Sequence, residues 1–465
     1  MGQGTETCLT FASFIFERVT HKSIAEDGME AMGDREGPMA FPFLRAIGVT
    51  LWLFYFLSSR GSGKEISDMA ISKKVKDALS NASWVRRMFE EGEELKRIHG
   101  DENVYDFSLG NPNLEPPASL KKALKALADH PVPGMHRYMA NSGYSDTRKA
   151  VADYLKEESG LPFNEKHVVM TVGAAGGLNV VLKSILDEGE EVIVPRPYFM
   201  EFKFYIENSG GDIRLVETNN NFSLNLSEIE KAIEKKTKAV LINSPNNPTG
   251  VVYNQASVEK LGELLKKKSR ELGKTLYLIT DEAYRRIVFD HIQLPIAFRH
   301  YPHTIRVTSH SKDLALAGER IGYIAVNPLC EEVDELISAI VFANRTLGFV
   351  NAPALMQRLV APLQKNSVDV GEYENKRDFF YRSLTAFGYE VVKPQGAFYL
   401  FPKAPIEDDV AFVRELQSKR ILTVPGTGFG KPGYFRIAYA VENRVIEAAL
   451  PGFKEVAEKH RVRKG

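Results

Sequence analysis

Strand-like and helix-like segments alternate along the middle of the chain, and this alternation limits the fold more than any other feature of the sequence. Short runs rich in β-branched residues lie at 166–172, 190–195, 212–218, 238–243 and 275–280. Amphipathic runs with a helical period separate them, at 175–186, 199–210, 226–236 and 256–272. The pattern predicts an α/β fold whose mostly parallel sheet is covered by helices on both faces. In such sheets ligands bind beyond the carboxyl ends of the strands, so functional residues are expected directly after each strand.

The C-terminal part of the chain predicts a second, smaller domain. A long helical stretch near 370–387 precedes short strand-like runs and a closing helix, at 397–402, 421–425, 434–440 and 441–460. This order is typical of an α+β domain. We expect 371–465 to form that domain together with 69–118, and 119–370 to form the large domain.

Residues 1–68 differ in character from the rest of the chain. Their apolar run, AIGVTLWLFYFL at 46–57, is shorter than a bilayer-spanning helix requires, and no clear small-residue cleavage site follows it. The codons of Lys64 and Glu65 can read as a purine-rich ribosome-binding sequence ahead of Met69. We therefore predict that this extension is disordered or not translated natively, and that a chain starting at Met69 is fully active. A genuine membrane anchor is the alternative.

The overall charge gives no reason to expect a polyanionic partner. The 465 residues include 60 Lys and Arg against 60 Asp and Glu, so neither nucleic acid nor a membrane surface is expected to bind. The two cysteines, Cys8 and Cys330, are far apart in sequence and fit neither a metal site nor a disulfide framework. The composition predicts a cytoplasmic enzyme that holds no metal ion.

Polar groups with specific chemistry follow several of the predicted strands. In NSPNNPTG (243–250), a rigid turn holds Asn247 just after an apolar strand. In LITDEAY (278–284), Asp281 ends a strand, where a buried acid requires either a cation or a proton. Tyr284 follows three positions later, so an amide, an acid and a phenol are expected at one edge of the sheet.

Lys312 stands at the end of a further strand, within TSHSKDLALAGER (308–320). Its neighbours are the hydroxyl residues Ser309 and Ser311 and a run of small apolar residues, and Arg320 follows eight positions later. A lysine in such a partly dry pocket loses its proton more easily and becomes a nucleophile or a base. On this stretch alone, a solvated surface lysine is the alternative.

Two weaker signals complete the set. The turn TVGAAGG (171–177) lacks bulk at Gly173, Ala174 and Ala175, so backbone N–H groups could approach an anion at a helix N-terminus, although small residues at turns are common. Tyr198 follows another strand and offers an aromatic face to a flat ligand, but it could equally belong to the core.

Together these groups match the needs of a planar aromatic cofactor that bears a phosphate: an acid for a ring nitrogen, an amide and a phenol for a ring oxygen, hydroxyls and an arginine for the phosphate, and a lysine for an imine. On NNPTG, DEAY, SHSK and Arg320, in this order, the chain resembles the fold-type I, class I/II aminotransferases that use pyridoxal 5'-phosphate, over about residues 69–465. The resemblance implies a large domain with a mostly parallel seven-stranded sheet and a smaller α+β domain. It also implies ping-pong transfer of an amino group between an amino acid and a 2-oxo acid.

The resemblance further implies roles for individual residues. Lys312 would hold the cofactor as an aldimine and act as the base, and Asp281 would pair with the ring nitrogen and stay charged because that cation lowers its pKa. Tyr284 and Asn247 would hydrogen-bond the ring oxygen, Asn247 would also contact the substrate, and Tyr198 would stack on the ring. The phosphate would be bound by Gly173, Ala174, Ala175, Ser309, Ser311 and Arg320.

The same resemblance places further residues near the substrate or a partner subunit. Arg436, in FRIAYA, would bind the substrate α-carboxylate, and Gly110, in SLGNPN, would line the same pocket. Tyr138 would reach the phosphate of the neighbouring subunit, which implies a homodimer with shared active sites. Relatives specific for aspartate often have a lysine in the phosphate turn, where this chain has Ala175. Arg345 is either a cross-subunit arginine or a surface residue, so a preference for dicarboxylates is left open.

Two other interpretations share parts of this pattern. A pyridoxal-phosphate-dependent lyase or decarboxylase on the same scaffold would need the same cofactor groups, so only its reaction distinguishes it. A regulator with an aminotransferase-like domain would need a basic helix-turn-helix segment before residue 69, and the sequence there is apolar and acidic instead.

Overall fold

The structure of the protein is a computed structural model that describes residues 71–80 and 84–462. The predictions made for residues 1–68 therefore concern a segment outside the described residues. The chain divides into two compact units, Met1–Asp77 and Ala78–Gly465. Helix α3 (Lys73–Ser80) spans the division, and the sheets and the main cleft belong to the second unit.

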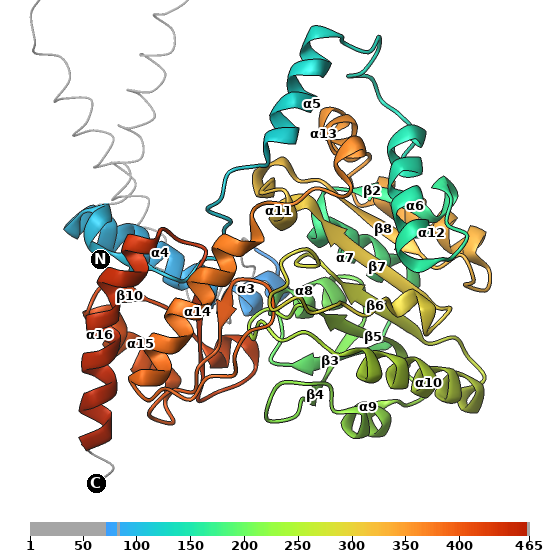
Figure 1. Cartoon of the computed structure of the whole chain (residues 1–465). Coiled ribbons are helices and arrows are strands. Elements are labelled where there is room, and N and C mark those ends of the chain that lie inside the picture. The colour runs from blue at the N-terminus through green and yellow to red at the C-terminus, as the bar shows by residue number, and fades with distance from the viewer. Residues whose placement is uncertain (1–70, 81–83, 463–465) are drawn as a thin grey trace, which may run out of the picture. The chain divides into compact units, whose positions relative to one another are not determined.

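A seven-stranded sheet is the main element of the second unit (Figure 1). The strand order is β2-β8-β7-β6-β5-β3-β4, and of these seven strands only β8 runs antiparallel to its neighbours. The strands are β2 (Val168–Thr171), β3 (Glu191–Arg196), β4 (Asp212–Glu217), β5 (Thr237–Asn243), β6 (Tyr277–Asp281), β7 (Thr304–Ser309) and β8 (Gly322–Val326). The predicted α/β class and the mostly parallel sheet of seven strands are confirmed.

Helices cover both faces of this sheet because successive side chains of a strand point in opposite directions. In β3, Val192 and Val194 pack into the core that contains residues of α7 and α12, whereas Ile193 packs into the core that contains residues of α9 and α10. Figure 1 shows α9 and α10 side by side along the sheet. The bounds are α7 (Gly173–Ile185), α9 (Leu226–Ala232), α10 (Gln255–Leu272) and α12 (Val333–Thr346). Both faces of the sheet are thus covered by apolar side chains, which suits the β-branched composition of the strands.

Two small sheets are built from the segments that precede and follow the large sheet in sequence. β1 (Tyr105–Asp106) pairs in parallel with β10 (Ile421–Leu422), and β12 (Phe435–Ala438) pairs antiparallel with β11 (Val424–Pro425) and β9 (Tyr399–Leu400). The other α-helices of this unit are α4 (Trp84–His99), α5 (Ala118–Asp129), α6 (Ser145–Ser159), α8 (Glu201–Asn208), α11 (His310–Asp313), α13 (Ala354–Val360), α14 (Val370–Ala386), α15 (Asp409–Ser418) and α16 (Asn443–Val462). The domain boundaries at 119 and 370 stay a prediction.

The described part of the chain contains no helix with the length and apolar character needed to cross a membrane. The same residues contain no cluster of three or more His, Cys, Asp or Glu side chains that could hold a metal ion. Cys330 is a buried free thiol, and burial raises its pKa to about 11.

Buried ion pairs join Glu158, on α6, to the large sheet. Its Oε2 accepts a hydrogen bond from Arg306 Nη1 at 2.6 Å, and its Oε1 pairs with Arg285. Arg306 is completely buried in β7, and its Nε lies 3.0 Å from Glu282 Oε2. Burial raises the pKa of Glu158, but the charges of Arg306 and Arg285 outweigh burial and lower it to about 2.

Glu158→Gln is expected to lower the free energy of unfolding by about 3–5 kcal/mol, because it removes one of the two carboxylates, Glu158 and Glu282, that pair with two buried guanidiniums. Urea titration at neutral pH measures this change. Because the folded-state pKa is lowered from 4.5 to about 2, the carboxylate stabilises the fold fully above pH 4.5 and loses this effect as the pH falls towards 2. The difference between the variant and the unchanged protein should therefore shrink in acid.

The neighbouring Glu157 provides the control for that experiment. It is exposed and pairs with the exposed Lys365, so Glu157→Gln should cost less than about 1 kcal/mol. An equal loss of stability in the two variants would contradict the structural role of the buried pair.

Candidate active site

The residues that follow the strands of the large sheet meet in one cleft. The ends of β5, β6 and β7 contribute Asn243, Asp281 and Ser309, because the carboxyl ends of parallel strands share one edge of the sheet. The residues predicted from the sequence that line this cleft are Gly110, Ala174, Ala175, Asn247, Asp281, Tyr284, Ser309, Ser311, Lys312, Arg320 and Arg436.

Lys312 extends from α11 into the cleft. Its Nζ donates a hydrogen bond to the carbonyl oxygen of Gly110 at 2.7 Å and lies 5.9 Å from the centre of the Tyr284 ring. Burial, and then the positive charges of Arg320 and Arg436, lower the pKa of Lys312 to about 8. A fraction of this amine is therefore neutral near physiological pH, which is the state that acts as a nucleophile or a base.

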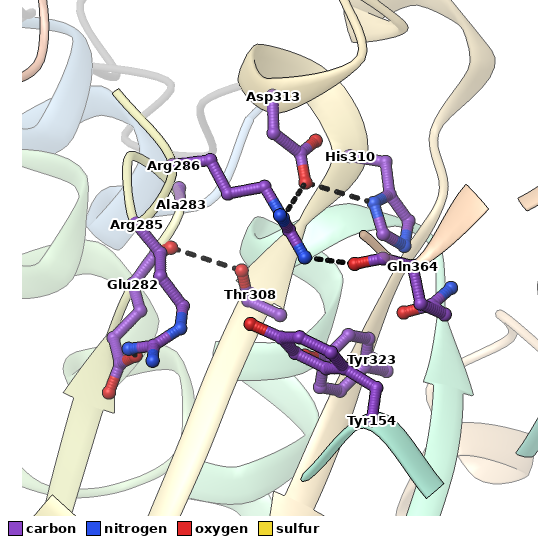
Figure 2. Close-up of a pocket in the computed structure, with 10 residues that line it drawn as sticks. All are labelled: Tyr154, Glu282, Ala283, Arg285, Arg286, Thr308, His310, Asp313, Tyr323 and Gln364. Atoms are coloured by element: carbon purple, nitrogen blue, oxygen red, sulfur yellow. Dashed lines mark hydrogen bonds and ion pairs between the residues drawn. The ribbon is translucent and has the colours of Figure 1, made fainter. Parts of the chain in front are cut away.

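The short helix that carries Lys312 is held by its first and last residues. His310 Nδ1 lies 3.2 Å from Asp313 Oδ2, and Arg286 Nε lies 3.8 Å from the same oxygen. Figure 2 shows these three side chains around a second, smaller cavity. These contacts fix the backbone that positions Lys312 without any contribution from a ligand in the cleft.

Asp281 is the last residue of β6 and is only 6% exposed. One carboxylate oxygen accepts a hydrogen bond from the backbone N–H of Ala283 at 3.2 Å. Burial raises the pKa of Asp281 to about 7 against the effect of that hydrogen bond, and the charge of Glu282 raises it further. The lowered pKa expected from the sequence is thus absent in the chain alone, where no described side chain forms an ion pair with Asp281. A buried carboxylate without an ion-pair partner among the described residues is suited to pair with a cationic ring nitrogen.

Two phenols lie together at the cleft. The hydroxyl oxygens of Tyr284 and Tyr399 are 2.5 Å apart, and burial raises the pKa of both groups. A Cβ atom at Gly110 would lie 2.1 Å from the Tyr399 hydroxyl, so only glycine fits there. Tyr399 lines the cleft but was not singled out in the sequence, because a tyrosine inside the apolar run AFYLFP resembles a core residue.

Arg436, in β12, is 2% exposed and points into the cleft. Its Nη1 donates a hydrogen bond to Asn247 Oδ1 at 3.1 Å, and its Nη2 donates to the carbonyl oxygen of Ser108. Burial lowers the pKa of Arg436. Tyr399, Tyr284 and, more weakly, the carboxyl group of Glu201 oppose that shift. These bonds orient a guanidinium whose planar donors suit a carboxylate.

Asn243 and Asn247 form a fixed pair at the end of β5. Asn243 Oδ1 accepts a hydrogen bond from the backbone N–H of Asn247 at 2.7 Å, and Asn243 Nδ2 donates to the carbonyl oxygen of Asp281 at 3.1 Å. Since Asn247 Oδ1 is used by the guanidinium of Arg436, the amide N–H₂ of Asn247 is the part that remains to donate to a ligand.

An arginine, two serines and a helix start form a site suited to an anion. The hydroxyl oxygens of Ser309 and Ser311 are 2.6 Å apart, and Arg320 Nη1 lies 3.5 Å from Ser311 Oγ. A Cβ atom at Gly173, the first residue of α7, would lie 2.8 Å from Arg320 Nη2, so glycine lets the guanidinium approach the helix start. Helix N-termini and guanidinium groups both favour phosphate.

Tyr198 lies outside the lining of the cleft, in contrast to its predicted position. It is 3% exposed, its hydroxyl lies 3.3 Å from Met200 Sδ, and burial raises its pKa to about 12. Its neighbour Phe199 lines the cleft instead. The chain after β3 thus presents the second aromatic residue of PRPYF to the cleft and directs the first into the core.

Tyr138 and Arg345 are also absent from the described lining of the cleft. Tyr138 lies between α5 and α6 with 92% of its surface exposed. Arg345 is exposed near the end of α12, and its guanidinium lies 5.5 Å from the ring centre of Phe342. Neither residue contributes to this cleft.

Sequence reasoning did not single out Glu201 and Tyr205, which line the cleft from α8. The signal was present, because residues four apart on a helix share a face and this helix follows the end of β3. The sequence alone does not show that this face of the helix points into the cleft.

The comparisons with known proteins agree with this geometry. The model of the family "Aminotransferase class I and II" matches residues 102–452. The chain is 31% identical over 361 residues to the probable aspartate aminotransferase of Methanocaldococcus jannaschii (76% of this chain, 93% of that protein). It is 32% identical over 359 residues to the aspartate aminotransferase of Thermotoga maritima (76% and 91%).

Solved structures give the same result. An amino transferase from Eubacterium rectale superposes with a TM-score of 0.82 at 37% identity, over 84% of this chain and 100% of that chain. The aspartate aminotransferase from Thermus thermophilus, solved with maleate, superposes with a TM-score of 0.74 at 27% identity, again over 84% and 100%.

The chain therefore belongs to the class I and II aminotransferases and has their fold-type I architecture. It is a transaminase that depends on pyridoxal 5'-phosphate and transfers an amino group between an amino acid and a 2-oxo acid. The cleft fits that cofactor, since it combines a lysine of lowered pKa, a buried carboxylate and an anion site. The comparisons give no support to a lyase or decarboxylase.

Proposed function

We propose that Lys312, Asp281 and Tyr284 carry the chemistry of this transaminase and that Arg436 receives the α-carboxylate of the substrate. The observation that carries the proposal is the convergence of a lysine of lowered pKa with a buried carboxylate that has no ion-pair partner among the described residues. When bound, the cofactor supplies an electron sink for the charge left at the α-carbon. A panel of amino acids with 2-oxoglutarate or pyruvate, followed at the cofactor absorbance, tests it, and failure of every donor would overturn it.

In this proposal each side chain has one task. Lys312 Nζ, neutral above a pH of about 8, moves the proton to and from the α-carbon. The Tyr284 phenol, held by Tyr399, and the amide N–H₂ of Asn247 donate to oxygen atoms of the cofactor or the substrate. Gly110 leaves room for the Tyr399 hydroxyl, which a side chain at position 110 would displace.

The phosphate is proposed to lie at Arg320, Ser309 and Ser311, against the start of α7. The backbone of Gly173, Ala174 and Ala175 supports this placement, since these residues begin that helix. Phe199 takes the stacking role that the sequence assigned to Tyr198, because Phe199 is the aromatic residue that lines the cleft after β3.

Arg436→Lys is expected to lower kcat/KM by a similar factor for every amino acid. The loss corresponds to about 2–5 kcal/mol of transition-state stabilisation. The reason is that lysine cannot supply two parallel donors to a carboxylate. Steady-state kinetics with four or five donors measures the loss, while the absorbance of bound cofactor should not change. Loss of cofactor, or loss of activity toward one class of side chain only, would contradict this role.

We also propose that the enzyme is a homodimer with shared active sites, in which Tyr138 reaches the phosphate bound by the partner subunit. The 92% exposure of Tyr138 supports this, because a protomer alone leaves that phenol in solvent. Sedimentation equilibrium at working concentration tests it, and a monomer that is fully active would overturn it.

A cytoplasmic location and domain boundaries at 119 and 370 are proposals as well. The location rests on the composition of the chain.

A further inference from the structure

Glu201 is a charged residue of the cleft that the proposed chemistry does not use. It lies in the first turn of α8 and lines the cleft together with Tyr205, one turn further along the same helix. Its Oε2 atom is buried and has no hydrogen-bond partner among the described residues. A buried carboxylate oxygen without a donor costs free energy, so this atom is suited to a donor that arrives with a ligand.

Glu201 lines the same cleft as Arg436, Tyr205 and Tyr399 and interacts electrostatically with all three. Burial raises its pKa, while its own backbone N–H and the charge of Arg436 oppose that shift. The charge of Glu201 in turn acts to raise the pKa values of Arg436, Tyr205 and Tyr399. Arg436 gives its hydrogen bonds elsewhere, as described above, and no ion pair between the two is found among the described residues. Glu201 thus shares the cleft with Arg436 but does not neutralise it, so its carboxyl group is left for the rest of a substrate that Arg436 holds.

We propose that Glu201 determines the amino donor: the enzyme prefers a substrate whose side chain ends in a nitrogen donor, an amide or an ammonium group, over one whose side chain ends in a carboxylate. This rests on the proposed function, because it takes Arg436 as the partner of the α-carboxylate. A substrate anchored at Arg436 extends its side chain within the same cleft that Glu201 lines.

Charge and surroundings both support this preference. The second carboxylate of an aspartate or glutamate substrate would lie against the carboxyl group of Glu201, and like charges brought together in a binding site oppose binding. An N–H donor would instead satisfy the buried oxygen. The apolar side chains of Leu109, Leu178 and Phe199 line the same cleft and limit solvent screening.

Succinate and its half-amide succinamate test the inference by binding alone, since they differ in one terminal group and do not react. The holoenzyme is expected to bind succinamate at least about 10-fold more tightly than succinate, measured by titration of the cofactor absorbance. Glu201→Gln should reduce that ratio by about 10-fold or more, mainly through tighter binding of succinate. Glu259→Gln, at an exposed carboxylate of α10, is the matched control and should leave the ratio unchanged.

The kinetic counterpart is the ratio of kcat/KM for glutamine to that for glutamate, which should fall in Glu201→Gln by a similar factor. Tighter binding of succinate than of succinamate by the unchanged enzyme would overturn the inference, even if the variant did not fold. A Glu201→Gln ratio within about twofold of the unchanged enzyme's would also overturn it. If no amino acid yields a 2-oxo acid, the proposed function fails, whereas the two binding constants still decide the role of Glu201.

Discussion

Lys312→Ala protein is expected to lose the absorbance of covalently held cofactor and to transaminate at least about 10²–10⁴-fold more slowly. The variant removes the amine of the cleft whose pKa is lowered to about 8, and with it both the attachment point and the proposed base. The absorbance spectrum and the single-turnover rate measure the two losses separately. A Lys312→Ala enzyme with near-normal turnover would refute the assignment.

Two further variants test whether the loss in Lys312→Ala comes from the missing amine. One controls for the lost positive charge and the other for the removal of a buried lysine. Lys312→Arg keeps a positive charge in the cleft but offers no amine that can form an imine, so it should be as inactive as the alanine variant. Lys376 is a second buried lysine, on α14, and burial lowers its pKa as well. Since Lys376 does not belong to the described lining of the cleft, Lys376→Ala should keep both the absorbance and the rate.

Asp281→Ala is expected to slow the reaction by about 10²–10³-fold, the usual effect of deleting one preorganised electrostatic partner. Its carboxylate is proposed to keep the ring nitrogen protonated, and a ring without that proton stabilises negative charge at the α-carbon poorly. Asp281→Glu retains the charge and should retain far more activity. Single-turnover rates at saturating substrate measure the difference, and equal rates in the two variants would argue against the role.

A stability measurement adds a readout that does not depend on turnover. In the cofactor-free protein, burial raises the pKa of Asp281 from 3.8 to about 7, so the ionised carboxylate is unfavourable in the folded state above that pH. Cofactor-free Asp281→Asn should therefore be at least as resistant to urea as the unchanged cofactor-free protein at a pH above 7. A clear loss of stability in Asp281→Asn would show that this carboxylate has a structural role instead.

The sequence predicted the sheet and most of the cleft because both follow from local patterns. Alternating periodicity identifies the strands and helices, and the parallel arrangement then brings the residue at the end of each strand to a common edge. Asp281, Ser309 and Lys312 could be placed together for this reason, before any tertiary contact was known. The number of strands followed only from the resemblance to known enzymes, and the order of the strands within the sheet was not predicted.

The misses have a different physical origin. Tyr198 and Phe199 are adjacent aromatic residues, and only the path of the backbone after β3 decides which of them faces the cleft. Glu201 and Tyr399 enter the site through the direction of a helix face and through the pairing of β9, both of which depend on long-range packing. The low pKa expected for Asp281 requires a neighbouring cation, which the described residues do not supply, so that expectation stays a prediction for the protein with bound cofactor.

The contact between Gly110 and Tyr399 has a consequence for how the active site can diverge. A side chain at position 110 would collide with a phenol whose hydroxyl is hydrogen-bonded to Tyr284, so position 110 cannot change unless position 399 changes with it. Mutational libraries that randomise position 110 alone should recover glycine almost exclusively. Libraries that randomise both positions should recover larger residues at 110 only in genotypes with a small residue at 399, a pattern of strong epistasis across nearly 300 residues of sequence that arises from one steric contact.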